Sequence, residues 1–147
     1  MGLADDLRGL RVCIDTAPFI YFIEKNPKYV GTLRPLFIEI NDGEIDALTS
    51  TITLLEVLVL PFKTKNEFLA EKYRDILLNA EGLATFEVCH EVSELSSKLR
   101  AKYSIRTPDA IQIAVGVIYG ADLFLTNDSA LKKVTDLKVL ILEDYLE

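Results

Sequence analysis

Short β-rich runs alternate with longer segments of helical periodicity along this chain. The β-rich runs predict strands at residues 11–14, 45–48, 84–88, 123–125 and 139–142. The helical patterns lie between them, at residues 16–25, 28–41, 51–60, 66–79, 91–103, 108–119 and, more briefly, 129–134. Strands that alternate with helices in this way indicate an α/β fold in which helical crossovers join parallel strands.

The length and composition of the chain are those of one globular domain. It has 147 residues, half of them apolar, so a single domain over residues 1–147 can bury roughly 70% of its unfolded surface. No apolar run approaches the roughly 20 residues of a membrane span, and the amino-terminal segment lacks the apolar region of a signal peptide. Cys13 and Cys89 lie in apolar stretches, which predicts two reduced core thiols in a cytoplasmic protein.

The net charge of −7 argues against a protein that grips nucleic acid by bulk charge. It does not exclude a nuclease, because a carboxylate pocket loaded with Mg²⁺ is locally neutral or positive, and a few basic residues at its rim can hold phosphates. Any one basic residue, taken alone, is better explained as solvated surface. The candidates for the rim are Lys25, Lys28, Arg100, Lys102, Arg106, Lys132 and Lys133.

Acidic residues follow two of the predicted strands. Asp15 comes directly after the strand at residues 11–14, and Asp128 comes shortly after the strand at residues 123–125. Ligands of parallel α/β sheets bind beyond the carboxyl ends of the strands, so both carboxylates are expected at one edge of the sheet. Two helices add acids of their own, since Glu56 interrupts the run ITLLEVLVL and Asp109 opens TPDAIQIAVGVIYG.

Helix capping is the alternative interpretation of two of these acids. Asp109 would be the second residue of a helix that Thr107 caps and Pro108 begins, where its charge favours the helix dipole. Asn127 and Asp128 would cap the short helix at residues 129–134 in the same way. Each of these two acids therefore has a structural explanation that needs no ligand.

Capping explains the other two acids less well. Glu56 has the capping-box spacing from Thr53, but the helical pattern begins near Thr51, which places Glu56 inside the helix and beside apolar neighbours. Asp15 ends a buried strand before an apolar helix, which puts a carboxylate at a buried sheet edge. A functional role is the stronger interpretation for Asp15.

The four acids together point to a metal site. Four carboxylates that converge on one edge repel each other unless a cation lies among them. Mg²⁺ and Mn²⁺ prefer hard oxygen ligands, and in phosphodiester cleavage one such ion activates a water while a second stabilises the leaving oxygen. The sequence therefore predicts a Mg²⁺ or Mn²⁺ site formed by Asp15, Glu56, Asp109 and Asp128.

Three motifs resemble those of the PIN-domain family, in particular the VapC-type toxin ribonucleases of bacterial and archaeal toxin–antitoxin pairs. They are VCIDTAPFIYFIE around Asp15, LTSTITLLEVL before and around Glu56, and RTPDAIQIAVGVIYGADLFLTND, which joins Asp109 to Asp128. The third is the most specific, and together the motifs extend the resemblance over nearly the whole chain.

The resemblance implies a three-layer α/β/α fold with a central, mainly parallel sheet, and a metal-dependent endoribonuclease that cuts single-stranded RNA. It gives Asp15, Glu56, Asp109 and Asp128 the catalytic and metal-binding roles. It also implies a homodimer and an antitoxin partner, for which the family often uses an apolar stretch such as residues 53–62. The residues that would support the ligands or contact phosphates are Thr16, Thr126 and Asn127.

Other chemistries lack their residues in this chain. There is no P-loop and no G-x-G-x-x-G fingerprint. His90 is the only histidine, which rules out a histidine-pair ribonuclease, and it is expected at the surface. A metal-dependent phosphatase of the haloacid-dehalogenase type would need a second acid where Ala17 stands. The surviving alternative is a non-catalytic PIN-like binding module whose acids hold no productive metal.

Overall fold

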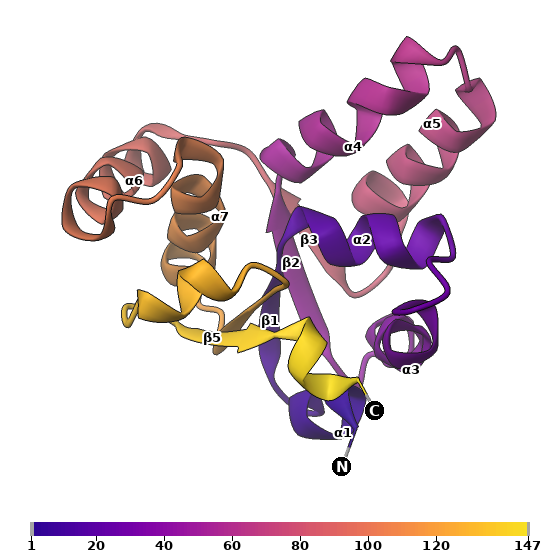
Figure 1. The fold of residues 1–147 in the computed structure, drawn as a ribbon, viewed down its shortest axis with the longest axis horizontal. Helices are drawn as coiled ribbons and strands as arrows, with labels where there is room; N and C mark the ends of the chain where they lie inside the picture. Colours follow the sequence, from indigo (N-terminus) through magenta and orange to yellow (C-terminus); the bar gives the residue numbers. More distant parts are fainter. Residues whose placement is uncertain (1, 147) are drawn as a thin grey trace.

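The computed structural model describes residues 2–146 and contains one five-stranded sheet (Figure 1). Its strand order is β3-β2-β1-β4-β5, and all neighbouring strands are parallel. The central strand β1 places Cys13 beside Leu48 of β2 and Phe124 of β4. The predicted parallel α/β sheet is thus confirmed. The strands are β1 (Arg11–Ile14), β2 (Asp46–Ser50), β3 (Leu83–Phe86), β4 (Leu123–Thr126) and β5 (Lys138–Ile141).

Helices cover both faces of this sheet, as the three-layer prediction requires (Figure 1). One face carries α1 (Leu3–Leu7), α2 (Thr16–Ile23), α3 (Val30–Asn41), α4 (Thr51–Lys63), α5 (Glu67–Arg74) and a π-helical turn, η1 (Asp75–Asn79). The other face carries α6 (His90–Tyr103) and α7 (Thr107–Ile118). Two short 3₁₀ helices, η2 (Ser129–Lys133) and η3 (Leu142–Tyr145), follow β4 and β5.

Two hydrophobic cores lie on the two sides of the sheet. Successive side chains of a strand point to opposite faces, so Val12 and Ile14 pack with α2 and α3, whereas Cys13 between them packs with α7. All three side chains are fully buried. A parallel sheet covered on both faces explains why its strands read as continuous apolar runs.

Gly116 brings α7 close to the sheet. A Cβ atom at this position would lie 2.8 Å from Leu137 Cδ2 and 3.1 Å from Cys13 Cβ, closer than side chains normally approach. A larger residue would require Leu137 to shift and Cys13 to move by a few tenths of an ångström, so glycine favours this close approach of α7 to β1. The close packing fixes the height of α7 above the sheet, and α7 carries Asp109 at its start.

Some local predictions need correction. The helix predicted at residues 66–79 stops its α-helical bonding at Arg74 and continues as a π turn, where the Thr85 hydroxyl from β3 donates to the Leu77 carbonyl. The prediction of two core thiols is right for Cys13 and wrong for Cys89, which is exposed at the start of α6. The short helices α1 and η3 are too brief to show a periodic pattern. No helix in residues 2–146 has both the length and the apolarity to cross a bilayer.

Candidate active site

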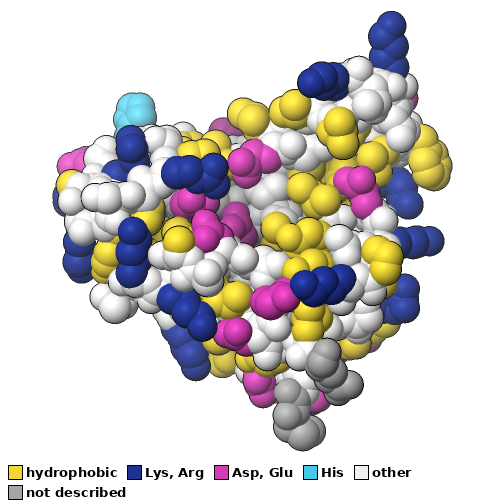
Figure 2. All heavy atoms as spheres, viewed as in Figure 1, with side chains coloured by type: hydrophobic (Ala, Val, Ile, Leu, Met, Phe, Trp, Pro, Cys, Tyr) yellow, Lys and Arg dark blue, Asp and Glu magenta, His cyan; other side chains and the backbone are white. Residues whose placement is uncertain are grey.

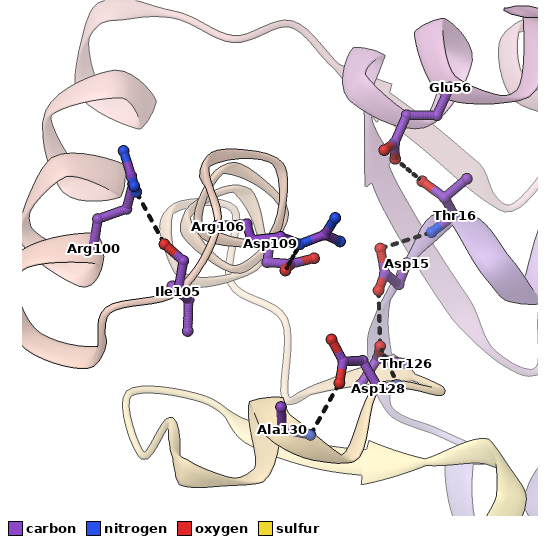
Figure 3. Close-up of polar contacts among 10 residues, drawn as sticks. All are labelled: Asp15, Thr16, Glu56, Arg100, Ile105, Arg106, Asp109, Thr126, Asp128 and Ala130. Atoms are coloured by element: carbon purple, nitrogen blue, oxygen red, sulfur yellow. Dashed lines mark hydrogen bonds and ion pairs between the residues drawn. The ribbon is translucent and has the colours of Figure 1, made fainter.

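The carboxyl ends of β1 and β4 open on a pocket of about 350 Å³. All four candidate acids line this pocket, although they come from different parts of the chain. Figure 2 shows Asp and Glu side chains gathered near the middle of one face, with Lys and Arg side chains around them. The close-up in Figure 3 shows the four carboxylates facing a common space. The structure thus brings these acids together, and their roles as ligands stay a prediction.

Asp15 is held between β1 and β4. Its backbone N–H donates to the Leu125 carbonyl at 2.9 Å. One carboxylate oxygen accepts from the Thr16 N–H at 2.8 Å, which caps α2, and the other accepts from the Thr126 hydroxyl at 2.8 Å (Figure 3). These bonds fix the carboxylate at the floor of the pocket.

The environment of Asp15 opposes its charge. Burial raises the pKa of Asp15 to about 6, and the negative charges of Asp109 and Glu56 act in the same direction. The bonds from the Thr126 hydroxyl and the Thr16 N–H counter part of this effect. The repulsion predicted from the sequence is therefore present, but burial contributes more than repulsion does.

Glu56 projects from the interior of α4, as predicted. The helix begins at Thr51 and is capped by the Ser50 hydroxyl, which accepts from the Ile52 N–H at 3.1 Å, so the capping-box interpretation of Glu56 is wrong. The Glu56 side chain is exposed, and its Oε1 accepts from the Thr16 hydroxyl at 2.6 Å (Figure 3). This bond orients Glu56 toward the pocket.

Asp109 lies in the first turn of α7 and is buried, with 7% of its surface exposed. The predicted Thr107 cap is wrong, because α7 begins at Thr107 and Arg106 occupies the cap position without a side-chain capping bond. Instead, Arg106 Nε donates to Asp109 Oδ2 at 3.2 Å, forming an ion pair at the mouth of the pocket (Figure 3). The side chain of Arg106 is otherwise exposed to solvent.

Asp128 caps η2, as the alternative interpretation proposed. Its Oδ1 accepts from the Ala130 N–H at 3.0 Å, and its own N–H donates to the Thr126 hydroxyl oxygen at 3.2 Å (Figure 3). Asp128 also lines the pocket, so capping and a site role are compatible. Asn127 lines the pocket too, and its Oδ1 accepts from the Glu143 N–H at 2.9 Å.

Arg106 is the one predicted rim cation that lines the pocket within residues 2–146. Arg100 instead braces the loop before α7, where its Nε donates to the Ile105 carbonyl at 2.9 Å (Figure 3). Three lysines pair with acids outside the pocket: Lys28 with Glu143, Lys102 with Asp136 and Lys132 with Asp144.

The donor set suits a hard divalent cation. It consists of carboxylate oxygens, the ligands that Mg²⁺ and Mn²⁺ prefer. Burial and, to a smaller extent, the charges of Asp109 and Glu56 raise the pKa of Asp15, and a cation in the pocket would oppose both effects. Yet in the described chain no three His, Cys, Asp or Glu side chains are arranged so that they could hold a metal ion as they stand. Mg²⁺ usually keeps several waters and binds through one or two carboxylates together with substrate phosphates.

Comparison with known proteins identifies the family. The sequence model of the PIN-domain family matches residues 12–137, so this chain belongs to that family. A comparison with curated proteins gave no match.

Solved structures show the same fold. A chain of VapBC2 from Rickettsia felis, bound to a promoter DNA fragment, is 18% identical with a TM-score of 0.70, over 90% of this chain and 98% of that one. A chain of a toxin–antitoxin complex from Klebsiella pneumoniae is 18% identical with a TM-score of 0.68, over 90% of this chain and 97% of that one. Mycobacterium tuberculosis VapC20, described as a Sarcin-Ricin loop cleaving toxin, is 15% identical with a TM-score of 0.67, over 86% of this chain and 98% of that one. These likenesses confirm the PIN-like α/β/α fold.

Proposed function

We propose that this chain is a metal-dependent endoribonuclease that cleaves RNA phosphodiesters with water and acts as the toxin of a type II toxin–antitoxin pair. The observation that carries the proposal is the pocket in which four carboxylates lie beside one guanidinium. Membership of the PIN-domain family supports it. The similar fold of VapC20, a Sarcin-Ricin loop cleaving toxin, supports RNA as the substrate.

The proposed cofactor is Mg²⁺ or Mn²⁺, held by Asp15, Glu56, Asp109 and Asp128. When bound, such an ion would stabilise negative charge on the phosphodiester and make a water more acidic. Thr16 and Thr126 support this arrangement, because each donates its hydroxyl proton to one of the carboxylates.

Arg106 is the proposed phosphate contact. Its pair with Asp109 uses Nε, which leaves the two terminal nitrogens as donors for a phosphate, a group that the guanidinium geometry suits. Asn127 at the same rim is a second polar contact for the RNA backbone. The lone histidine, His90, is exposed at the start of α6, so water is the proposed nucleophile in place of a histidine-activated 2′-hydroxyl.

A homodimer and an antitoxin are the proposed protein partners. Large apolar side chains are exposed on α4 and α5, and Figure 2 shows several hydrophobic side chains on the visible surface. Exposed apolar surface of this kind marks an interaction site, and toxin–antitoxin complexes are among the structures of similar fold. These exposed side chains are Leu55, Val59, Leu60, Phe62 and Phe68.

The test of the activity uses the purified chain, freed of any partner, and an unstructured RNA. Cleavage is expected with Mn²⁺ and not with EDTA, and Asp15→Asn is expected to abolish it. Wild-type protein that binds Mn²⁺ yet leaves RNA intact would favour the non-catalytic binding module. Light scattering tests the dimer, since a mass near 16.5 kDa at micromolar concentration would show a monomer.

A further inference from the structure

Gln112 lies in α7, three residues after Asp109, and its side chain is 1% exposed. Its Oε1 accepts from the Ser50 hydroxyl at 2.7 Å. Its Nε2 donates to Thr53 Oγ1 at 2.6 Å and to Thr16 Oγ1 at 3.3 Å. One amide thus joins α7 to the end of β2, to α4 and to α2. No motif or periodicity in the sequence predicts this role for Gln112.

Each hydrogen bond among the side chains around Gln112 has a defined donor and acceptor. The Thr49 hydroxyl donates to the Ile14 carbonyl at 2.8 Å, so the 2.8 Å contact between Thr49 and Thr53 is a donation by Thr53. Thr53 has then used its proton and can only accept from Gln112. A rotated amide would set its oxygen against the Thr53 oxygen, so Oε1 must face Ser50. In residues 2–146 no buried side-chain nitrogen or oxygen lacks a partner.

Thr16 connects this chain of hydrogen bonds to the pocket. Its oxygen accepts from Gln112, and its single proton goes to Glu56 Oε1 at 2.6 Å. Glu56 is otherwise an exposed side chain on a helix surface, which would sample several rotamers. Through Thr16, the buried amide therefore helps to select the orientation of the Glu56 carboxylate.

Gln112 also sets the spacing of two helices. Residues three apart on a helix share a face, so Asp109 and Gln112 lie together on α7, as Thr53 and Glu56 do on α4. The Gln112–Thr53 bond joins these faces below the pocket, and the carboxylates of Asp109 and Glu56 line the pocket itself. A change in that bond would move one carboxylate relative to the other.

We propose that Gln112 is a positioning residue, which acts through Thr16 and Thr53 to hold Glu56 opposite Asp109 in the arrangement that binds the divalent cation. The inference rests on the proposed function, since it assigns a role toward that cation. Groups that hold metal ligands in place typically change metal affinity or activity 10- to 100-fold when they are removed.

The test measures Mn²⁺ binding by calorimetry on the full chain without RNA, well below the melting temperature. Gln112→Met keeps the side-chain length and removes the hydrogen bonds, and it is expected to raise the Mn²⁺ dissociation constant roughly 10- to 100-fold. Thr16→Val is expected to act similarly, and Thr16→Ser, which keeps the hydroxyl, to restore wild-type affinity. In the double variant Gln112→Met/Thr16→Val, the loss of Mn²⁺ binding free energy should be smaller than the sum of the two single losses, because both changes break the same chain of hydrogen bonds.

Ser96→Ala is the matched control. The Ser96 hydroxyl is also buried, and it donates to the Val92 carbonyl at 2.7 Å within α6, away from the pocket. Its loss is expected to leave Mn²⁺ affinity unchanged.

A purely structural role for Gln112 would lower the melting temperature of Gln112→Met and leave its Mn²⁺ affinity at the wild-type value, which would overturn the inference. If that variant does not fold, Gln112→Asn replaces it. The shorter amide keeps its polarity but cannot reach both threonines, so weaker Mn²⁺ binding is expected and wild-type binding would refute the role. Wild-type protein that binds no Mn²⁺ would instead refute the proposed function, and this inference with it.

Discussion

Asp15→Asn removes one negative charge from the pocket while keeping the size of the side chain. The amide oxygen can still accept from the Thr16 N–H and cap α2. The Thr126 hydroxyl donates to the other carboxylate oxygen, and in the variant it faces the amide NH2 group and loses its acceptor. The variant therefore removes the charge and keeps one of the two side-chain hydrogen bonds.

The size of that cost follows from the pKa of Asp15, which burial raises to about 6 from an ordinary value of 3.8. A tenfold change in acidity corresponds to about 1.4 kcal/mol, so the charged carboxylate opposes folding by about 3 kcal/mol at pH 7. Solvent on the open side of the pocket and the loss of the Thr126 bond reduce the net gain to about 1 kcal/mol. Without metal, Asp15→Asn should thus melt about 2–4 °C above wild type.

The dependence on pH has a definite sign. The folded pKa of Asp15 lies above the unfolded one, so the folded protein holds more protons between these two values. The contribution of Asp15 to stability therefore falls as pH rises from about 4 to about 6, and the penalty persists above that window. Asp15→Asn should lack this part of the pH dependence.

Metal should reverse the order of the two proteins. Mn²⁺ at ten times its dissociation constant should stabilise wild type by about 1.4 kcal/mol and the variant much less. Thermal melts of both proteins, at several pH values and with EDTA or Mn²⁺, measure these effects. A variant that melts below wild type in EDTA, and that responds equally to Mn²⁺, would show that the carboxylates do not form one metal site.

Three further outcomes are expected. Asp109→Asn should lower the cleavage rate roughly 100-fold or more with an unchanged circular dichroism spectrum, because a ligand of a catalytic metal acts mainly on the transition state. Asp128→Ala should lose the cap of η2 and about 0.5–2 kcal/mol of stability, whereas Asp128→Asn should keep the cap, and melts in EDTA compare them. The RNA products should carry a 5′-phosphate and a 3′-hydroxyl, so a 2′,3′-cyclic phosphate detected by mass spectrometry would contradict attack by water.

The order and type of the main elements follow from hydrophobic periodicity, and the strand ends show where this reasoning stops. The strand predicted at residues 45–48 in fact continues through Thr49 and Ser50. Both side chains are fully buried, but their polarity makes them resemble a loop in the sequence. They can be buried because the Thr49 hydroxyl donates to the Ile14 carbonyl and the Ser50 hydroxyl donates to Gln112 Oε1, two partners that lie far away in the chain.

Thr126 at the end of β4 shows the same limit. The apolar pattern ends at Leu125, yet the strand includes Thr126, which is fully buried and donates to Asp15. Three of the four acids were visible in the sequence because strand ends and helix starts are predictable places, and Glu56 was visible because it interrupts an apolar run. The partner of each acid was not, because a partner depends on packing between helices and strands. Thus Arg106 was one of seven possible rim cations until the structure placed it beside Asp109.

The partners of Asp15 and Glu56 explain how the pocket can be ordered and still attract a cation. Hydroxyls orient these two carboxylates, from Thr126 and from Thr16. A neutral donor fixes the direction of a carboxylate without cancelling its charge, whereas a lysine in its place would supply the charge that a metal is needed to supply. Arg106, the one cation that lines the pocket in residues 2–146, has an exposed side chain that pairs with Asp109 and leaves Asp15 and Glu56 without a cationic partner. Burial raises the pKa of Asp15, and the negative charges of Asp109 and Glu56 raise it further, so a divalent ion in the pocket would lower it.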